Sequence, residues 1–350
     1  MKKGSQTKLT DIHFKELGVE DERFYEALLN QSFPVPKGSS FFDDFPIWSN
    51  QFDSRTIKIG AFDSQNLIGC AGLRFANLTL PLSEIKIGII GGVVVHPQYR
   101  KKGVANQLIK RLVEVAKTEQ SVMVILWGSE HELYQRLGFE LCGLQVRVPL
   151  AKLDLPKAKG IIRFGWRQSI FEAMQKRNSG LKLDSNDISW LSAHKNVQWL
   201  SEETLTDQSS YVGFNRGIDL RGMVHEWGGP RNQVKNLLAR VLEQIPSAEI
   251  LGSPAGIKSL GFSFEPNQLE YLCLAKILDP LAIMKATERN TSFQCSQTHT
   301  GQWSLKVNGQ KIENLTSGEL TKLFFGPEKI RGFNEAPFPI PFWVWGLDAA

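Results

Sequence analysis

The sequence predicts a mixed α/β protein of the α+β kind, with two similar mixed-sheet units in tandem and a smaller C-terminal α/β region. Its 350 residues exceed the size at which one hydrophobic core usually stops growing. Strand-like runs alternate with helical patterns along the chain. The segment "YQRLGFEL" (134–141) has an echo in "IKSLGFSF" (257–264), which indicates an internal repeat. We therefore expect units at residues 1–155, 156–280 and 281–350.

The first unit has the predicted order strand, helix, three strands, helix, strand, helix. A weakly alternating strand at Leu9–Leu17 precedes an amphipathic helix at residues 20–33, which acidic residues open. A short helical turn near residues 43–48 leads to two strands within residues 56–80, joined at Asp63–Asn66. The remaining elements are a buried strand at Ile85–Val95, a helix that starts just after Gly103, a strand at residues 121–128 and a short helix at residues 129–139.

Fewer sequence patterns predict helices and strands in the second unit and the tail. Two strands within residues 210–229, a helix at residues 232–245 and a strand at residues 248–255 repeat part of the first unit. The C-terminal region predicts a hairpin across Asn308–Gly309 and a helix with a capping box from Thr316 to Glu319. The last fifteen letters, "APFPIPFWVWGLDAA", are too aromatic for a frayed end, so we expect the tail to be tied down.

The junction "VVVHPQYRKKGVANQLIKRLVEVAK" (Val93–Lys117) predicts an anion site. A glycine turn feeds the start of a helix, where free backbone N–H groups and the helix dipole favour negative charge. Arg100, Lys101 and Lys102 add side-chain charge just before Gly103. A solvated basic turn is the alternative for such a cluster. The chain has no P-loop, and "GIIGGV" lacks the spacing of a dinucleotide fingerprint.

Composition excludes several classes of protein. A net charge of +5 is too mild for the concentrated basic face of a nucleic-acid binder. The four cysteines form no C-x-x-C pair, and neither a secretory signal nor a membrane-length apolar stretch is present, so we expect a cytoplasmic protein without membrane association. The scattered histidines predict no metal site, and no serine lies in a G-x-S-x-G elbow.

Two motifs carry a family resemblance. Arg100, Gly103 and Ala105 form an R-x-x-G-x-A pattern between strand and helix, which resembles the pyrophosphate motif of the GNAT superfamily of N-acetyltransferases. "LWGSEHELYQRLGF" places Tyr134 shortly before Gly-Phe, which resembles the Eis-like tandem acetyltransferases. That resemblance implies acetyl-coenzyme A as acetyl donor. It also implies two acetyltransferase-type units followed by a sterol-carrier-like C-terminal region.

The resemblance also implies which residues hold acetyl-coenzyme A. A strand edge pairs with the pantetheine arm, the basic turn binds the diphosphate, the Val95 amide faces the developing oxyanion, and two residues before the last helix lie beside the cofactor. The residues concerned are Val93, Val94, Val95, Arg100, Lys101, Lys102, Gly103, Val104, Ala105, Asn106, Ser129 and Glu130. In the second unit "GGPRNQ" does not reproduce the basic turn, so we expect no cofactor there.

For catalysis, the resemblance implies Tyr134 as general acid for the leaving thiolate and the carboxylate of Ala350 as general base. Asp348 and Glu84 are competing bases, and an ordinary helix tyrosine is the alternative for Tyr134. The leading hypothesis is an N-acetyltransferase acting on a primary amine of a small molecule or protein. The alternative is a noncatalytic module that binds acetyl-coenzyme A or another protein. The sequence leaves homo-oligomer formation open.

Overall fold

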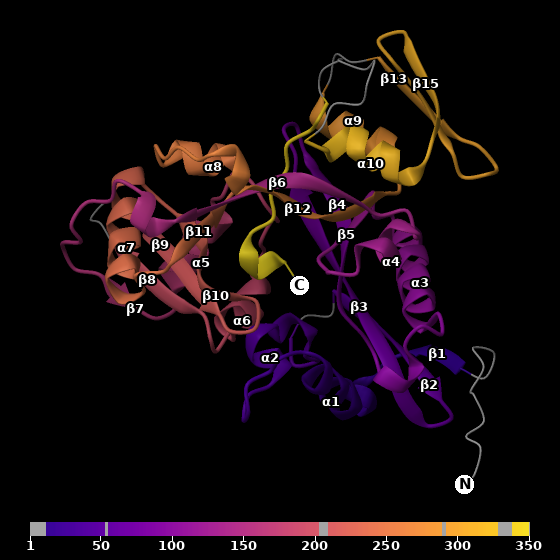
Figure 1. Cartoon of the computed structure of the whole chain (residues 1–350), viewed down its shortest axis with the longest axis horizontal. Coiled ribbons are helices and arrows are strands. Elements are labelled where there is room, and N and C mark those ends of the chain that lie inside the picture. The colour runs from indigo at the N-terminus through magenta and orange to yellow at the C-terminus, as the bar shows by residue number, and fades with distance from the viewer. Residues whose placement is uncertain (1–11, 53–54, 203–208, 289–291, 328–337, 350) are drawn as a thin grey trace.

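The computed structural model describes residues 12–52, 55–202, 209–288, 292–327 and 338–349. Within these residues a twelve-stranded sheet runs through both predicted units, with the strand order β1-β2-β3-β4-β5-β12-β6-β11-β10-β9-β8-β7 (Figure 1). A separate three-stranded sheet, β13-β14-β15, belongs to the C-terminal region. The predicted mixed α/β fold with two sheet-bearing units is confirmed.

The first unit follows the predicted order of elements. Its helices and strands are β1 (Ile12–Glu16), α1 (Glu22–Ser32), α2 (Phe41–Asp44), β2 (Thr56–Asp63), β3 (Asn66–Thr79), β4 (Glu84–Val95), α3 (Val104–Thr118), β5 (Met123–Leu126), α4 (His131–Gln135) and β6 (Glu140–Pro149). The predicted helix after Gly103 begins at the next residue because Gly103 adopts a left-handed N-cap conformation. Of the first predicted strand, residues 9–11 lie outside the described residues.

The second unit repeats this order in shorter form. Its elements are β7 (Arg163–Phe164), α5 (Gln168–Gln175), α6 (Asp187–Ser192), β8 (Gln198–Glu202), β9 (Ser210–Arg216), β10 (Leu220–Gly228), α7 (Arg231–Gln244), β11 (Glu249–Gly252), α8 (Pro254–Ser259) and β12 (Leu269–Ile277). As in the first unit, an antiparallel hairpin (β9 and β10) leads through a helix to a strand that pairs in parallel with its second arm.

The two units exchange strands, which the sequence analysis did not anticipate. β12 is the last strand of the second unit in sequence but pairs antiparallel with β5 of the first. β6 is the last strand of the first unit in sequence but pairs with β11 of the second, and β6 and β12 also pair with each other. This exchange joins both units into one sheet. The boundaries at residues 155 and 280 stay a prediction, and strand pairing crosses the first of them.

The C-terminal region packs on the exchanged strands. Its elements are α9 (Pro280–Thr287), β13 (Phe293–Gln297), β14 (Trp303–Val307), β15 (Gln310–Leu315) and α10 (Ser317–Phe325). The hairpin across Asn308–Gly309 and the capping box from Thr316 to Glu319 are confirmed. The described part of the tail, residues 338–349, joins neither sheet and ends in a short 3-10 turn, η7 (Gly346–Asp348). The sterol-carrier likeness stays a prediction.

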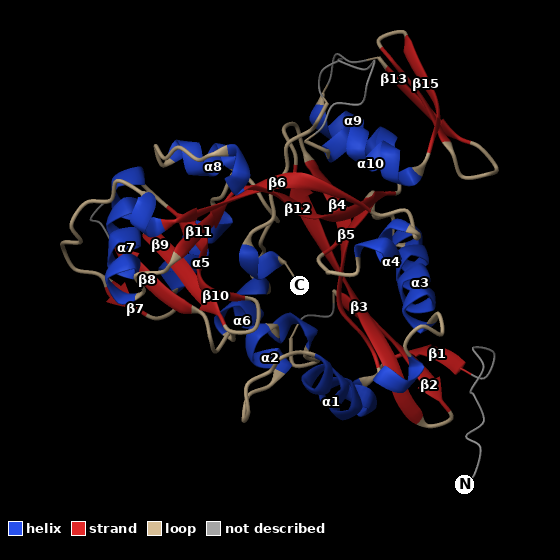
Figure 2. Ribbon diagram, in the orientation of Figure 1, coloured by secondary structure: helices blue, strands red, loops and turns tan. Residues whose placement is uncertain are grey.

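Helices cover the first unit's sheet on both faces (Figure 2). α3 packs on one face through Leu108 and Leu112, in a cluster that includes Leu73 and Ile90. The opposite face carries Cys70 and Val94 in a second cluster, with side chains from α1, α6 and the tail. We call these the α3 face and the tail face. A group bound between β4 and β5 would therefore meet different residues from each face.

Candidate active site

β4 and β5 pair over only part of their length. The parallel ladder joins residues 87–90 of β4 to residues 123–126 of β5, and β4 then continues alone to Val95. A bulge accompanies this divergence, because Gly72 pairs with Gly91 but Cys70 pairs with Val94, and Gly92 has a φ of +59°. Among the described residues, no strand pairs with residues 91–95 on the β5 side. We call this stretch the open edge.

The three predicted valines lie along the open edge. Val94 is buried on the tail face, whereas Val93 and Val95 are half-buried and belong to the margin of the α3-face cluster. Their backbone N–H and C=O groups on the β5 side can accept an extended ligand in the way that a sheet edge accepts a peptide. Val95 also pairs with Gly69 of β3 on its other side, so the edge is held in place.

The basic turn lies directly beyond the open edge. Arg100 donates a hydrogen bond from Nε to the Val95 carbonyl oxygen at 3.1 Å, which ties the turn back to the strand. Lys101 has a φ of +60° and Gly103 a φ of +84°, so two left-handed residues curl the backbone just before α3. Arg100 and Lys101 are exposed. The turn therefore presents cations and backbone donors together.

The first turn of α3 completes this anion site. Val104 is buried and anchors the helix, whereas Ala105 and Asn106 are half-buried. The Oδ1 atom of Asn106 is buried and has no hydrogen-bond partner among the described residues. Lys102 is half-buried, with its Nζ 4.8 Å from the centre of the Tyr99 ring. These residues fit a diphosphate, because N–H donors, charge and a helix N-terminus converge there.

Tyr134 approaches the end of β5 from the α3 face. The residue is 6% exposed and belongs to the same cluster as Ile90 and Phe139. A Cβ atom on Gly128 would lie 2.9 Å from the Tyr134 hydroxyl, so only glycine allows this approach. Burial raises the pKa of Tyr134, and the charge of Glu130 adds to the effect. The hydroxyl is therefore protonated at neutral pH and can donate a proton. Ser129 and Glu130 are exposed at the start of α4.

The three carboxylates considered as bases occupy different places. Glu84 is exposed at the opposite end of β4, where its Oε1 lies 3.8 Å from Lys182 Nζ. Eleven steps of strand at ~3.3 Å each put Glu84 roughly 36 Å from Val95. This distance argues against Glu84 as the base for a reaction at the open edge. Asp348 lies in η7 on the tail face, and Ala350 lies outside the described residues.

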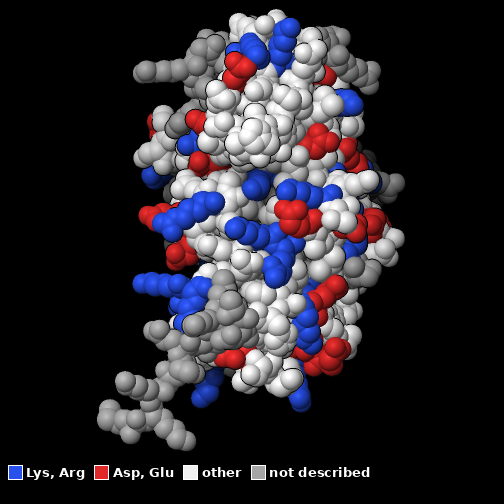
Figure 3. Space-filling model, turned by 90° about the vertical axis from the view of Figure 1, so that its right-hand side faces the viewer, with Lys and Arg blue, Asp and Glu red and all other residues white. Residues whose placement is uncertain are grey.

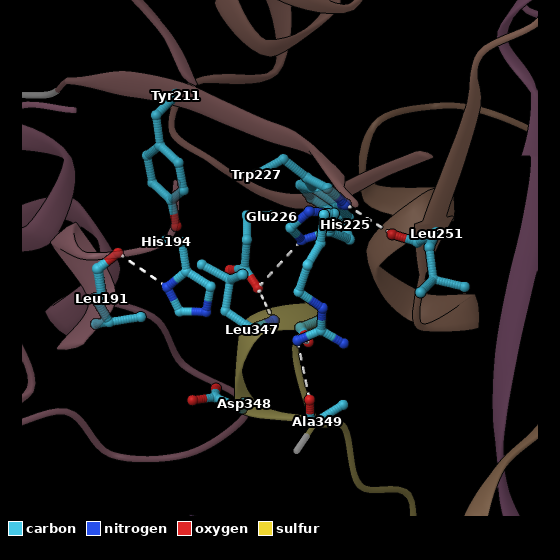
Figure 4. Close-up of polar contacts among 12 residues, drawn as sticks. Leu191, His194, Tyr211, His225, Glu226, Trp227, Leu251, Leu347, Asp348 and Ala349 are labelled. Atoms are coloured by element: carbon cyan, nitrogen blue, oxygen red, sulfur yellow. Dashed lines mark hydrogen bonds and ion pairs between the residues drawn. The ribbon is translucent and has the colours of Figure 1, made fainter. Parts of the chain in front are cut away.

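Asp348 is buried and faces the first unit. Its Oδ1 lies 3.7 Å from Nη1 of Arg74, a residue of β3. Burial raises the pKa of Asp348 to about 7, Arg74 and Arg177 oppose the rise, and Glu226 and Asp187 add to it. The second unit holds the tail through Glu226, which accepts from the Leu347 N–H, and through Arg216, which donates to the Ala349 carbonyl (Figure 4). No local sequence pattern marks this role for Glu226.

The corresponding place in the second unit is built differently. β10 and β11 pair in parallel only at residues 223–224 and 249–250, but the Trp227 indole N–H donates to the Leu251 carbonyl at 3.1 Å and bridges the strands beyond. Only Gly229 and Pro230 separate β10 from α7. Ile257 takes the place of Tyr134, since Phe262 N donates to Ile257 O just as Phe139 N donates to Tyr134 O.

Residues 13–142 match the family model described as an acetyltransferase (GNAT) domain. The matched part of the chain contains the open edge, the basic turn and Tyr134. The predicted resemblance is confirmed for the first unit. Comparison with curated protein sequences found no matching relative.

Solved structures share the fold over most of the chain. A GCN5-related N-acetyltransferase from Kribbella flavida is 16% identical with a TM-score of 0.63, covering 87% of this chain and 84% of its own. A GCN5-related N-acetyltransferase from Anabaena variabilis is 13% identical with a TM-score of 0.60, covering 88% and 85%. Eis1 from Mycobacterium abscessus is 14% identical with a TM-score of 0.57, covering 86% and 84%.

The surface and the remaining side chains add few further signals. On the side where α3 lies in Figure 1, Lys and Arg side chains cross the middle of the molecule, with Asp and Glu among them (Figure 3). In the described part of the chain, no group of three or more His, Cys, Asp or Glu side chains is arranged to hold a metal ion. None of the described helices has both the length and the hydropathy of a membrane span.

Proposed function

We propose that this protein is an acetyl-coenzyme A dependent N-acetyltransferase that moves the acetyl group to a primary amine by direct attack. The observation that carries the proposal is the convergence of the open edge, the basic turn and Tyr134 around one end of the β4–β5 pair. Bound acetyl-coenzyme A would supply an acetyl thioester as the electrophile. Everything else follows from how this chain's residues hold and polarise that group.

The fit to acetyl-coenzyme A rests on complementary chemistry along β4 and α3. Backbone groups of Val93, Val94 and Val95 offer a sheet edge for the amides of the pantetheine arm. The turn from Arg100 to Gly103 and the start of α3 offer charge and N–H donors for the diphosphate. The Val95 amide would stabilise the developing oxyanion, which is a large contribution in acyl transfer.

Tyr134 would act as general acid toward the leaving thiolate. Its raised pKa keeps the hydroxyl protonated. The ring packs against Gly128 and Phe139, so the hydroxyl that donates the proton is held in one position. Ser129 and Glu130, at the start of the same helix, would border the cofactor.

A carboxylate of the tail would act as general base on the opposite face. Arg74, which faces Asp348, and Cys70, which pairs with Val94, point to the same side of β3 because they are an even number of residues apart. Four residues of strand place them roughly 13 Å apart, which is the scale of a small acceptor. The Ala350 carboxylate and the Asp348 side chain are the two candidates.

A noncatalytic module that binds acetyl-coenzyme A or another protein is the second candidate. The second unit favours it, because that unit keeps the fold with Ile257 where the first has Tyr134. Tyr134 itself favours catalysis, since a pure binding site has no need of a proton donor at the end of β5. The candidate acceptors are primary amines of small molecules and of proteins.

The test is an acceptor screen with release of free thiol as readout. Small primary amines, aminoglycosides, polyamines and lysine peptides are each mixed with acetyl-coenzyme A and the wild-type chain. With an accepted amine, Tyr134→Phe should keep acetyl-coenzyme A affinity and lose about a hundredfold or more in kcat, because only the proton donor is removed. Ile257→Val, at the matching place in the second unit, should keep wild-type turnover. Full turnover in Tyr134→Phe would return Tyr134 to an ordinary packing role.

A further inference from the structure

The last residues of the tail are hydrogen-bonded to the second unit. Leu347 donates its backbone N–H to Glu226 Oε1 at 2.8 Å. Arg216 donates from one nitrogen, Nη1, to the carbonyl oxygens of Gly346 at 2.8 Å and Ala349 at 3.0 Å. Glu226 lies in β10 and Arg216 ends β9, so one hairpin binds both sides of η7. Figure 4 shows Glu226 and the tail residues facing one another.

Packing next to these hydrogen bonds leaves the tail little freedom. A Cβ on Gly346 would lie 2.6 Å from the Cβ of His225, so β10 and the tail are in direct contact. Trp345 donates from its indole to the Ser179 carbonyl at 3.1 Å, and the Arg177 guanidinium lies 4.2 Å from the centre of its ring. Trp345, Leu347 and Asp348 are all buried.

The charges around Glu226 make it a fixed anchor. Glu226 is fully buried and forms an ion pair with Arg177, whose guanidinium also donates to the Tyr211 hydroxyl. Burial alone would raise the pKa of Glu226, but Arg177, His225 and the Leu347 N–H together outweigh burial and the net shift is downward, so Glu226 is ionised. Burial lowers the pKa of His225 and of His194, the latter to about 3, so both imidazoles are neutral.

The anchored tail ends over the first unit. Asp348 faces Arg74 of β3, which also lies 4.5 Å over the ring of Trp190. Leu347 belongs to the same buried cluster as Val94 of the open edge. The tail therefore contacts both the β9–β10 hairpin of the second unit and the tail face of the first unit's sheet, which carries the proposed active site.

We propose that the second unit is a clamp that positions the chain's last residues for the first unit's reaction, with Arg216 and Glu226 as positioning residues. This inference rests on the proposed function, in which a tail carboxylate is the base. It gives the second unit a task that does not require acetyl-coenzyme A. The clamp acts by geometry, because a base displaced by about 1 Å can cost roughly a hundredfold in rate.

The sharpest test is Gly346→Ala in the full-length chain. The added methyl group meets the His225 Cβ, which cannot move without shifting β10, so the tail must shift instead. We expect kcat to fall at least tenfold with an accepted amine. The KM for acetyl-coenzyme A and the rise in melting temperature on adding acetyl-coenzyme A should both be unchanged. A carboxypeptidase should release the C-terminal alanine faster than from wild type.

Two further variants keep the test sharp. Gly318→Ala, in the first turn of α10, is the matched control, because its nearest neighbour is the flexible end of Glu140 and kcat should stay at the wild-type value. Arg216→Ala should lower kcat like Gly346→Ala, and Arg216→Lys should recover part of the loss because a donor remains. These variants move the base without touching the acetyl-coenzyme A site, so a loss confined to kcat supports the clamp.

Unchanged kcat in Gly346→Ala and Arg216→Ala, with or without faster release of alanine, overturns the clamp. Equal loss in Arg216→Lys and Arg216→Ala, together with a fall in melting temperature, also overturns it in favour of a purely structural contact. Failure of the proposed function has a different signature. In that case wild type itself releases no thiol with any amine.

Discussion

The two units differ most where a strand gives way to a helix. In the first unit β4 ends at Val95, and the residues up to Gly103 form a turn with three cations before α3. In the second unit β10 ends at Gly228, and only Gly229 and Pro230 precede α7. The strands and helices match, but the basic turn, the proposed anion site, is present once. Binding chemistry therefore resides in the loop, and the fold persists without it.

The two units also differ in what lies between their diverging parallel strands, β4 and β5 in the first unit and β10 and β11 in the second. Beyond Ile90 the open edge of β4 is available to a ligand, and Tyr134 stands at its far side. Beyond Val224 the second unit places the Trp227 indole between β10 and β11, and Ile257 replaces the tyrosine. Under the proposed function, the pantetheine arm would lie at the matching place in the first unit.

The largest effect should come from filling the basic turn. Gly103→Val places a β-branched residue at a φ of +84°, where its Cβ is strained and blocks backbone approach to the diphosphate. The rise in melting temperature caused by acetyl-coenzyme A in wild type should disappear, because that rise reflects binding to the folded state alone. Arg231→Ala, at the start of α7 in the second unit, should keep the full rise. An undiminished rise in Gly103→Val would remove the proposed anion site.

A smaller effect should separate the two tail carboxylates. Asp348 has its pKa raised to about 7, so it is protonated below that pH and can act as a base only above it. If Asp348 is the base, kcat should rise with pH around 7, and Asp348→Asn should abolish that rise and cost about a hundredfold at pH 8.

If the Ala350 carboxylate is the base instead, Asp348→Asn should stay active. Extending the chain by two glycines should then lower kcat, because the carboxylate is moved from its place. Deleting residues 348–350 should lower kcat in either case while acetyl-coenzyme A still raises the melting temperature. Full turnover after that deletion would rule out both carboxylates as the base.

The smallest effect concerns the second unit as a binding site. Calorimetry should give one acetyl-coenzyme A per chain, because the second unit has neither the basic turn nor an open strand gap. Trp227→Ala should leave the stoichiometry at one, since removing the indole does not restore the turn. Two equivalent sites in wild type would contradict the contrast between the units.

Local patterns in the sequence predicted what depends on neighbours along the chain. The strand at Ile85–Val95, the helix after Gly103 and the hairpin across Asn308–Gly309 each rest on a period or a turn residue, and each is confirmed. The sites themselves were predicted by family motifs at Arg100 and Tyr134, and their roles stay predictions.

What could not be predicted depends on partners far apart in sequence. β6 and β12 give no sign of exchange, because the strand beside which an apolar segment lies is set by tertiary packing. Arg216 and Glu226 look like ordinary strand residues until the tail is placed against them. Glu84 was a candidate base because it is acidic and belongs to β4. The sequence does not say which end of β4 lies beside the reacting groups.

The exchanged strands set an order of events during synthesis. β5 of the first unit can pair with β12 only when β12 has been translated, after the rest of the second unit. At ~5–20 residues per second, a ribosome leaves the first unit's sheet incomplete for several seconds or longer. The tail that Glu226 holds emerges later still. Under the proposed function, a nascent chain would therefore contain the basic turn well before the tail that supplies the base.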